Sequence, residues 1–122
     1  MYELILEKAR IRIEIKVIPM GNDLCLTITG GDQPHIGAAA LSVPRPSMAV
    51  SGVNSASTSV LTLTGHKDDD LARLVSAALA SRLNKHIIVI CGIHLDEITP
   101  EEIDIVNRIA MESVEKIINF FQ

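Results

Sequence analysis

The chain has 122 residues, of which 48% are hydrophobic, and a formal net charge of −4, with no tryptophan, one tyrosine and two phenylalanines. This length accommodates one core, so we expect residues 1–122 to form a single domain. The few aromatic residues and the scattered basic residues argue against nucleic-acid binding, and no apolar run approaches the ~20 residues of a membrane span. The first residues carry charges throughout and lack a signal-peptide pattern, so we expect a soluble, cytoplasmic protein without membrane contact.

Alternating apolar and charged residues predict a strand over residues 10–17. Turn chemistry follows, and a second alternating stretch over residues 24–28 completes a hairpin. The alanine-rich residues 36–42 and the Thr/Val/Leu-rich residues 58–64 predict two more strands. Residues 44–57 between them hold two prolines and many serines, which predicts a long loop of the kind that is often functional or mobile.

The second half of the chain predicts two helices around one strand. Apolar residues at helical spacing over 71–83 follow three acids at 68–70, which favour the positive end of a helix. The continuous apolar run over residues 86–91 suits a strand covered on both faces. Thr99 then fits an N-cap and Glu102 the reciprocal partner of a capping box, so a second helix is predicted to begin there.

The last helix carries more apolar residues than one stripe needs. Three of them lie partly off the main stripe: Ile105, Met111 and Ile118. A second apolar face suggests another surface to cover, such as a second subunit, so we expect a homo-oligomer.

The element order is then β-β-β-β-α-β-α, which predicts an α+β domain with two helices packed on a mostly antiparallel sheet of about five strands. Cys25 and Cys91 fall in apolar strand patterns and are predicted to be buried, reduced thiols.

Three predicted strands end in similar chemistry, each with a glycine, a histidine and a nearby aspartate. Asp32 and His35 follow one strand, residues 65–68 (Gly-His-Lys-Asp) follow another, and residues 92–96 (Gly-Ile-His-Leu-Asp) follow a third. Ligands tend to bind beyond the carboxyl ends of strands, so three ends on one edge would build one site. His86 has no such neighbours and is predicted to be a surface residue.

This chemistry suits a divalent metal ion, an anion, or both. Imidazole and carboxylate together suit Zn, Mn, Fe or Co. Gly65 and Lys67 at a helix start offer backbone N–H groups and a positive charge to a phosphate. Each motif alone also has a structural interpretation, because Asp32 fits an Asx-turn and the acids at 68–70 fit a solvated helix start. The sequence contains no GxSxG motif and no recognisable Cys–His pair, which are the patterns that would indicate covalent catalysis. An enzyme is therefore not the favoured interpretation.

With these residues in hand, the chain resembles the small subunit-D family of gallate and hydroxyarylic acid decarboxylases, whose members are described as prenylated-flavin chaperones. The matching segments are GGDQPHIGAAAL (30–41), GHKDD (65–69) and CGIHLD (91–96). They occur in the family's order, and the resemblance extends over nearly the whole chain. Asp68 departs from the pattern, in which an acid one methylene longer is expected after the lysine, so its reach differs.

The resemblance implies a non-enzymatic protein that holds prenylated FMN, or FMN, through a divalent metal ion and the flavin phosphate and passes it to a prenyl-FMN-dependent decarboxylase. The cofactor-binding side chains that it implies are Asp32, His35, His66 and Lys67. Gly30, Gly31, Gly37 and Gly65 are predicted to let the backbone approach the cofactor closely. The metal ligands that it implies are Asp32, His35, His66, Asp68, His94 and Asp96. The predicted loop over residues 44–57 is long enough to fold over the flavin ring.

Two alternatives remain open at this point. The same cluster would suit a small metal-dependent enzyme acting on a phosphorylated small molecule. The chain would also suit an assembly or interaction subunit in which the histidines and aspartates are structural.

Overall fold

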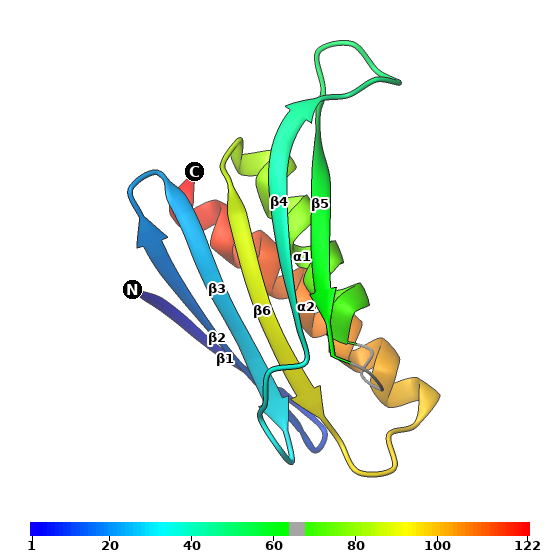
Figure 1. Cartoon of the computed structure of the whole chain (residues 1–122). Helices are drawn as coiled ribbons and strands as arrows, with labels where there is room; N and C mark the ends of the chain where they lie inside the picture. Colours follow the sequence, from blue (N-terminus) through cyan, green and yellow to red (C-terminus); the bar gives the residue numbers. More distant parts are fainter. Residues whose placement is uncertain (64–67) are drawn as a thin grey trace.

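The computed structural model describes residues 1–63 and 68–122 (Figure 1). Its elements in chain order are β1 (Tyr2–Lys8), β2 (Ile11–Met20), β3 (Asp23–Gly31), β4 (Ala38–Pro46), β5 (Asn54–Thr62), α1 (Asp68–Leu83), β6 (Ile87–His94) and α2 (Pro100–Phe121). In the described part, no helix is both long and apolar enough to cross a membrane.

The strands form one six-stranded sheet in the order β1-β2-β3-β6-β4-β5, in which only the β3–β6 pair is parallel. The predicted α+β class is confirmed, but the strand count is six and the order is β-β-β-β-β-α-β-α. The additional strand is β1, which pairs along its whole length with β2. Ile5 interrupts the apolar–charged alternation there, so the pattern that marks β2 is weaker in β1.

The prediction of one long loop over residues 44–57 is wrong, because half of this segment belongs to strands. Pro44 pairs with Ala56, and the pairing continues to Pro46 and Asn54, so only residues 47–53 connect β4 to β5. β6 pairs with β4 only as far as Ser42, so the later part of β4 has one neighbour and tolerates the missing N–H of proline. Figure 1 shows this hairpin projecting beyond the rest of the sheet.

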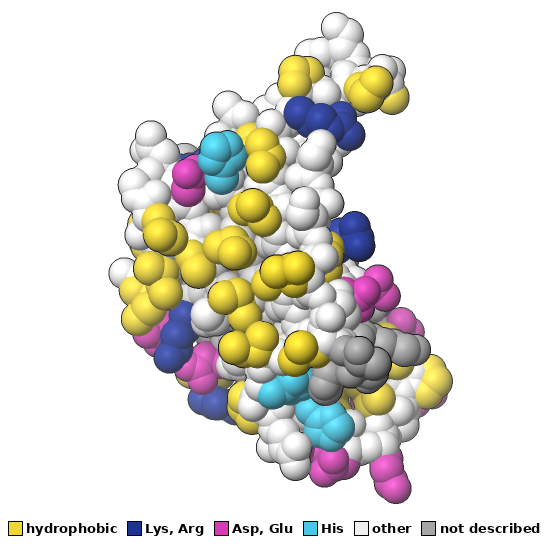
Figure 2. Space-filling view, viewed as in Figure 1, with side chains coloured by type: hydrophobic (Ala, Val, Ile, Leu, Met, Phe, Trp, Pro, Cys, Tyr) yellow, Lys and Arg dark blue, Asp and Glu magenta, His cyan; other side chains and the backbone are white. Residues whose placement is uncertain are grey.

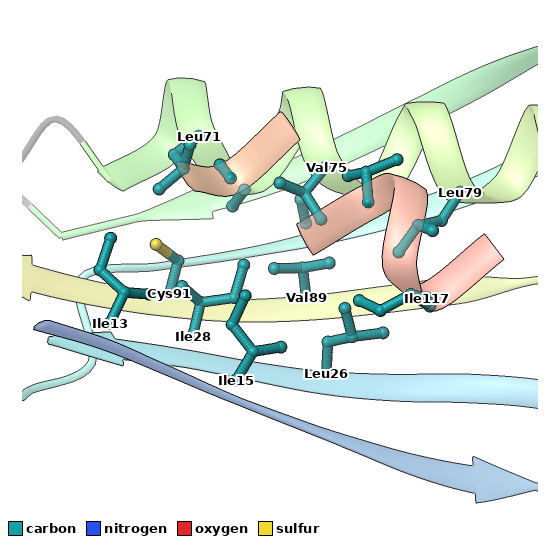
Figure 3. Close-up of a cluster of buried hydrophobic side chains, with 14 of the residues drawn as sticks. Ile13, Ile15, Leu26, Ile28, Leu71, Val75, Leu79, Val89, Cys91 and Ile117 are labelled. Carbon is teal, nitrogen blue, oxygen red and sulfur yellow. The ribbon is translucent and has the colours of Figure 1, made fainter. Parts of the chain in front are cut away.

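Both helices pack on the same face of the sheet. α1 lies over β4, β5 and β6, and α2 lies against α1, β1 and β2. The alternate residues of the strands that point toward the helices form the core with the inner helix faces (Figure 3). Each fully buried aliphatic side chain contributes about 1.5–3 kcal/mol. The largest fully buried side chains of this core are Ile11, Ile13, Ile15, Leu26, Ile28, Leu79, Ile87 and Ile117.

The capping box at the start of α2 is confirmed. The Thr99 hydroxyl accepts a hydrogen bond from the backbone N–H of Glu102 at 3.1 Å, and the Glu102 carboxylate accepts one from the backbone N–H of Thr99 at 3.1 Å. These bonds satisfy donors that a helix start leaves free.

The expectation of a second apolar face on α2 is wrong. Ile118 is buried in the core and Ile105 packs partly against it, so of the three residues only Met111 is exposed. The reason is that α2 contacts α1 on one side and β1 and β2 on another, which buries a wider arc than one stripe.

Candidate functional site

Three strands end at the same edge of the sheet. β3 and β6 are parallel, with Gly31 beside His94, and β5 runs in the same direction because β4 is antiparallel to both β5 and β6. The segments after β3 and β6, and the start of α1, therefore meet at this edge, as the sequence predicts.

The connection from β3 to β4 has to cross β6, which lies between them in the sheet (Figure 1). It crosses directly over Gly92, where a side chain would overlap the backbone carbonyl of His35. The Gly37 N–H then donates to the Cys91 carbonyl at 2.9 Å and leads into β4. Glycine at position 92 thus fixes where His35 lies.

Asp68 is the central acid of this edge. It is the first residue of α1 and only 7% exposed. Its Oδ1 accepts a hydrogen bond from the Ile93 N–H at 2.9 Å and lies 3.9 Å from the Cys91 thiol. Its Oδ2 lies 3.2 Å from Nε2 of His35. A buried carboxylate needs such partners to offset its lost hydration, so Asp68 holds the helix start, β6 and the crossing segment together.

Gly37 allows the Asp68 carboxylate to lie there. A side chain at Gly37 would overlap that carboxylate. The glycines predicted to let a backbone approach a ligand thus also let parts of this chain approach one another. Gly31 is a second example, because it has a φ of 75° and lies against the His94 carbonyl.

Cys91 is a buried free thiol, as predicted, whereas Cys25, which was also predicted to be buried, is partly exposed. Burial raises the pKa of Cys91 well above its ordinary value, and the nearby carboxylate of Asp68 raises it further.

A hydrogen bond to the backbone fixes which ring nitrogen of His35 carries the proton. Nδ1 lies 3.0 Å from the carbonyl oxygen of Gln33, which can only accept, so Nδ1 carries the proton. Nε2 of the same ring lies 3.2 Å from the Asp68 carboxylate, so this pair links the crossing segment to the start of α1.

His94 lies next to His35. The two rings have centroids 6.5 Å apart and planes at 74°. Nε2 of His94 lies 2.9 Å from Oδ1 of Asp96, which orients the ring. His94 is less buried than His35, so it is the more accessible of the two imidazoles.

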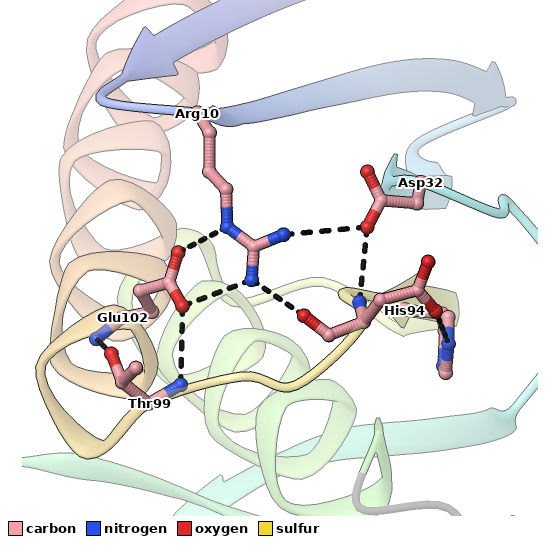
Figure 4. Close-up of polar contacts among 6 residues, drawn as sticks. Arg10, Asp32, His94, Thr99 and Glu102 are labelled. Carbon is pink, nitrogen blue, oxygen red and sulfur yellow. Dashed lines mark hydrogen bonds and ion pairs between the residues drawn. The ribbon is translucent and has the colours of Figure 1, made fainter.

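Asp32 belongs to a group of contacts among Arg10, Asp32, Asp96 and Glu102, which we call the Arg10 clamp (Figure 4). Its Oδ2 accepts a hydrogen bond from the Asp96 N–H at 3.0 Å and lies 3.5 Å from Arg10. Arg10 also donates to the Asp96 carbonyl at 2.7 Å and to both oxygens of Glu102, at 2.6 and 3.0 Å. This clamp fixes the β6–α2 loop that carries His94 and Asp96.

The clamp shifts the titration of Glu102. The Arg10 guanidinium, and then the Thr99 backbone N–H, lower the pKa of Glu102 to about 2. The same carboxylate stabilises Arg10 in its charged form and raises the pKa of that guanidinium. Nothing in the local sequence singles out Arg10, because its main partner lies 92 positions away.

An open pocket of about 410 Å³ lies between the start of α1, the end of β6 and the start of α2. Its wall is mostly apolar, with carboxylates at one side. The lining residues are Asp68, Asp70, Leu71, Ile93, His94, Leu95, Ile98, Ile103, Val106 and Asn107. Pockets of this size and apolar character are typical of small-molecule sites.

Comparison with known proteins gives one family. Residues 7–122 match the family model of the prenylated flavin chaperone LpdD-like domain. The chain belongs to this family. No curated protein matches it.

The fold of this LpdD-like domain also resembles a solved structure described as the crystal structure of a novel chaperone complex for yeast 20S proteasome assembly. The TM-score is 0.58 with 14% sequence identity, over 98% of this chain and 94% of that chain. At this identity the likeness concerns the fold alone.

The predicted site residues of the LpdD-like domain fall into three groups. His35 and Asp68 form one pair and His94 and Asp96 another, and the two pairs adjoin through the histidine rings. Asp32 lies in the Arg10 clamp, and Gly30, Gly31 and Gly37 pack against protein. Gly65, His66 and Lys67 lie outside the described residues. Among residues 1–63 and 68–122, no three histidine, cysteine or acidic side chains are placed to share a metal ion.

Proposed function

We propose that this chain binds prenylated FMN, or FMN, at the edge where β3 and β6 end, and delivers it to a prenyl-FMN-dependent decarboxylase. The observation that carries this proposal is the family match over residues 7–122. The neighbouring histidines beside an apolar pocket support it, because a flavin needs an apolar surface against its ring and polar contacts to its phosphate.

The flavin ring is assigned to the pocket between α1 and α2. Residues 47–53, which join β4 to β5, lie at the other end of the sheet, because β4 runs away from the edge that carries His94. They therefore do not reach this edge, and the apolar pocket walls formed by Leu71, Ile98 and Ile103 take their place as the surface for the ring.

A divalent cation is part of the proposal for an electrostatic reason. Asp68 and Asp70 line the pocket, and their carboxylates repel a flavin phosphate. A metal ion held by Asp68 with either His35 or His94, and by His66, would reverse that repulsion, and Lys67 would add a contact to the phosphate. Asp32 and Asp96 would then serve by holding the loop that carries His94.

Isothermal calorimetry with FMN and riboflavin tests this assignment. We expect FMN to bind more tightly than riboflavin, and a chelator to remove the difference. His94→Ala should weaken FMN binding by about tenfold or more, since one charge-assisted contact is worth about 1.5–3 kcal/mol. His86→Ala is the matched control, because His86 is an exposed histidine at the opposite end of β6, beside Asp23. Equal affinity for FMN and riboflavin, unchanged by chelator and by His94→Ala, would contradict the proposal.

A second candidate is an assembly subunit that holds no ligand. The uncovered apolar face of the sheet favours it, and the structural neighbour belongs to a chaperone complex. Calorimetry separates the two candidates, because an assembly subunit would bind neither flavin.

A further inference from the structure

The face of the sheet opposite the helices is apolar across its centre. Pairing of neighbouring strands places Ile18, Cys25, Ile88 and Leu41 in one row, and Ile90, Ala39 and Leu61 in the next. We call these seven residues the open sheet face. Figure 2, drawn in the orientation of Figure 1, shows hydrophobic side chains spread across this face.

Nothing in the described part of the chain covers the open sheet face. Leu41 is 45% exposed although β4 lies between β6 and β5, and Leu61 on the neighbouring edge strand β5 is 79% exposed. Both helices pack on the other face. A contiguous apolar surface of this kind marks an interaction site in a stable protein.

The sequence of β6 independently indicates a cover on this side. Ile87 and Val89 point into the core, and Ile88 and Ile90 point to the open sheet face. An apolar run without alternation is typical of a strand buried on both faces. In one copy of the chain only one of these faces is buried.

The charges around the open sheet face fit a second copy of the same chain. Its centre carries no charge, and the β1–β2 side carries both signs close together, as in the pairs Arg12–Glu7 at 3.2 Å and Lys16–Glu14 at 3.5 Å. A strongly acidic or basic partner would find no complementary field there. A two-fold interface requires a patch that is complementary to itself, and an apolar centre beside a mixed-charge side meets that requirement.

An interface over the whole helix-free side of the sheet, with the open sheet face at its centre, has sufficient area. Six strands about 4.8 Å apart and about eight residues long, at about 3.3 Å per residue, give this side an area of about 750 Å². A standard stable interface buries about 800 Å² on each partner. Two sheets stacked in this way pack about 10 Å apart, with the helices on the outside.

We propose that two copies of this chain pack through their open sheet faces, giving a four-layer helix–sheet–sheet–helix homodimer. This replaces the outer face of α2 as the expected oligomer surface. It does not rest on flavin binding, and the hairpin tip and the histidine pairs lie at opposite ends of the sheet, outside the centre of the contact.

Sedimentation equilibrium and light scattering on the full chain test this proposal. Leu41→Lys and Leu61→Lys each place a charge in the contact twice, once per copy, and should raise the dimer dissociation constant by on the order of 100-fold or more. Leu74→Lys is the matched control, because Leu74 is 43% exposed on α1 and lies on the helix side. A wild-type chain that stays monomeric, or two face variants that dimerise like wild type, would overturn the proposal.

Cys25 gives a readout that needs no substitution. It is partly exposed on the open sheet face, whereas Cys91 is fully buried and serves as an internal control for folding. Alkylation of Cys25 should slow as the wild-type concentration rises through the dimer dissociation constant, with Cys91 unmodified throughout. A Cys25 rate independent of concentration would overturn the proposal and leave this face to a different protein.

Discussion

Gly92 lies directly beneath the backbone of His35, so closely that a side chain at position 92 would overlap the His35 carbonyl. The contact exists because the β3–β4 connection must cross β6 to reach its place in the sheet. The glycine at position 92 of β6 thus determines where His35 lies in the candidate site.

Gly92→Ala should destabilise the fold and displace His35. We expect the free energy of unfolding to fall by about 1–3 kcal/mol, the usual effect of overpacking, and FMN affinity to fall with it. Urea unfolding and calorimetry measure the two effects. Gly52→Ala is the comparison, because Gly52 has open space around it and a φ of 79°, so its loss reflects backbone strain alone. FMN affinity that changes equally in both variants would contradict the role given to Gly92.

Asp68→Asn should separate the charge of this acid from its shape. The side chain can still accept a hydrogen bond from the Ile93 N–H, but it loses the negative charge that lies beside Nε2 of His35 and the Cys91 thiol. We expect a loss of about 1–3 kcal/mol in the free energy of unfolding, because the substitution removes one partner of a buried charged contact. Asp69→Asn, in the same helical turn but less buried, should cost only the ~0.3–1 kcal/mol of a dipole contact. Equal losses from the two variants would show that the buried contacts of Asp68 do not matter.

The Arg10–Glu102 pair should make the protein sensitive to acid. The pKa of Glu102 is lowered from 4.5 to about 2, so the folded chain gives up this proton more readily than the unfolded chain. The stabilisation is therefore complete above about pH 4.5 and is lost as the pH falls toward 2. Urea unfolding of Glu102→Gln should show a smaller loss of stability across this window than wild type.

Glu101→Gln provides the control for that acid experiment, because Glu101 is an exposed acid in the same turn of α2. Its pH dependence should follow wild type. A Glu102→Gln variant that loses as much stability in acid as wild type would show that other carboxylates dominate the acid response.

Ile103→Asp should weaken flavin binding without unfolding the domain. Ile103 lines the pocket and is 43% exposed, so the fold does not depend on it, but a flavin ring would bury the new carboxylate. We expect affinity for FMN and riboflavin to fall by about tenfold. Met111→Asp, at a similarly exposed position on α2 outside the pocket, should leave both affinities unchanged. Wild-type affinity in Ile103→Asp would remove the pocket as the ring site.

Local sequence pattern predicted the elements whose signals lie within a few residues. The alternation in β2 and the Thr99–Glu102 capping box are of this kind, and both are confirmed. The shared edge of His35 and His94 also followed from the pattern, because each lies at or just after a strand end and the two strands run in one direction. The pairing of residues 44–46 with 54–56 could not be inferred, because the serines and prolines there favour loops and only the register holds them in strands.

Relationships between distant residues were beyond local pattern. Arg10, in the turn before β2, looks like any other charged residue of the alternating sequence until the fold places Glu102 beside it. Asp68 has the sequence signature of a solvated helix start, yet the fold buries it against Ile93 and Gly37. Tertiary packing, which local sequence pattern does not contain, therefore decides the roles of Arg10 and Asp68.

Cofactor transfer tests the central claim most directly. The chain would be loaded with prenylated FMN, separated from free ligand by gel filtration, and mixed with an apo form of a prenyl-FMN-dependent decarboxylase, with decarboxylase activity followed over time. We predict that the flavin stays with the chain through gel filtration and activates the decarboxylase faster than the same concentration of free prenylated FMN. Loss of the flavin during gel filtration, or activation no faster than by free ligand, would contradict the account.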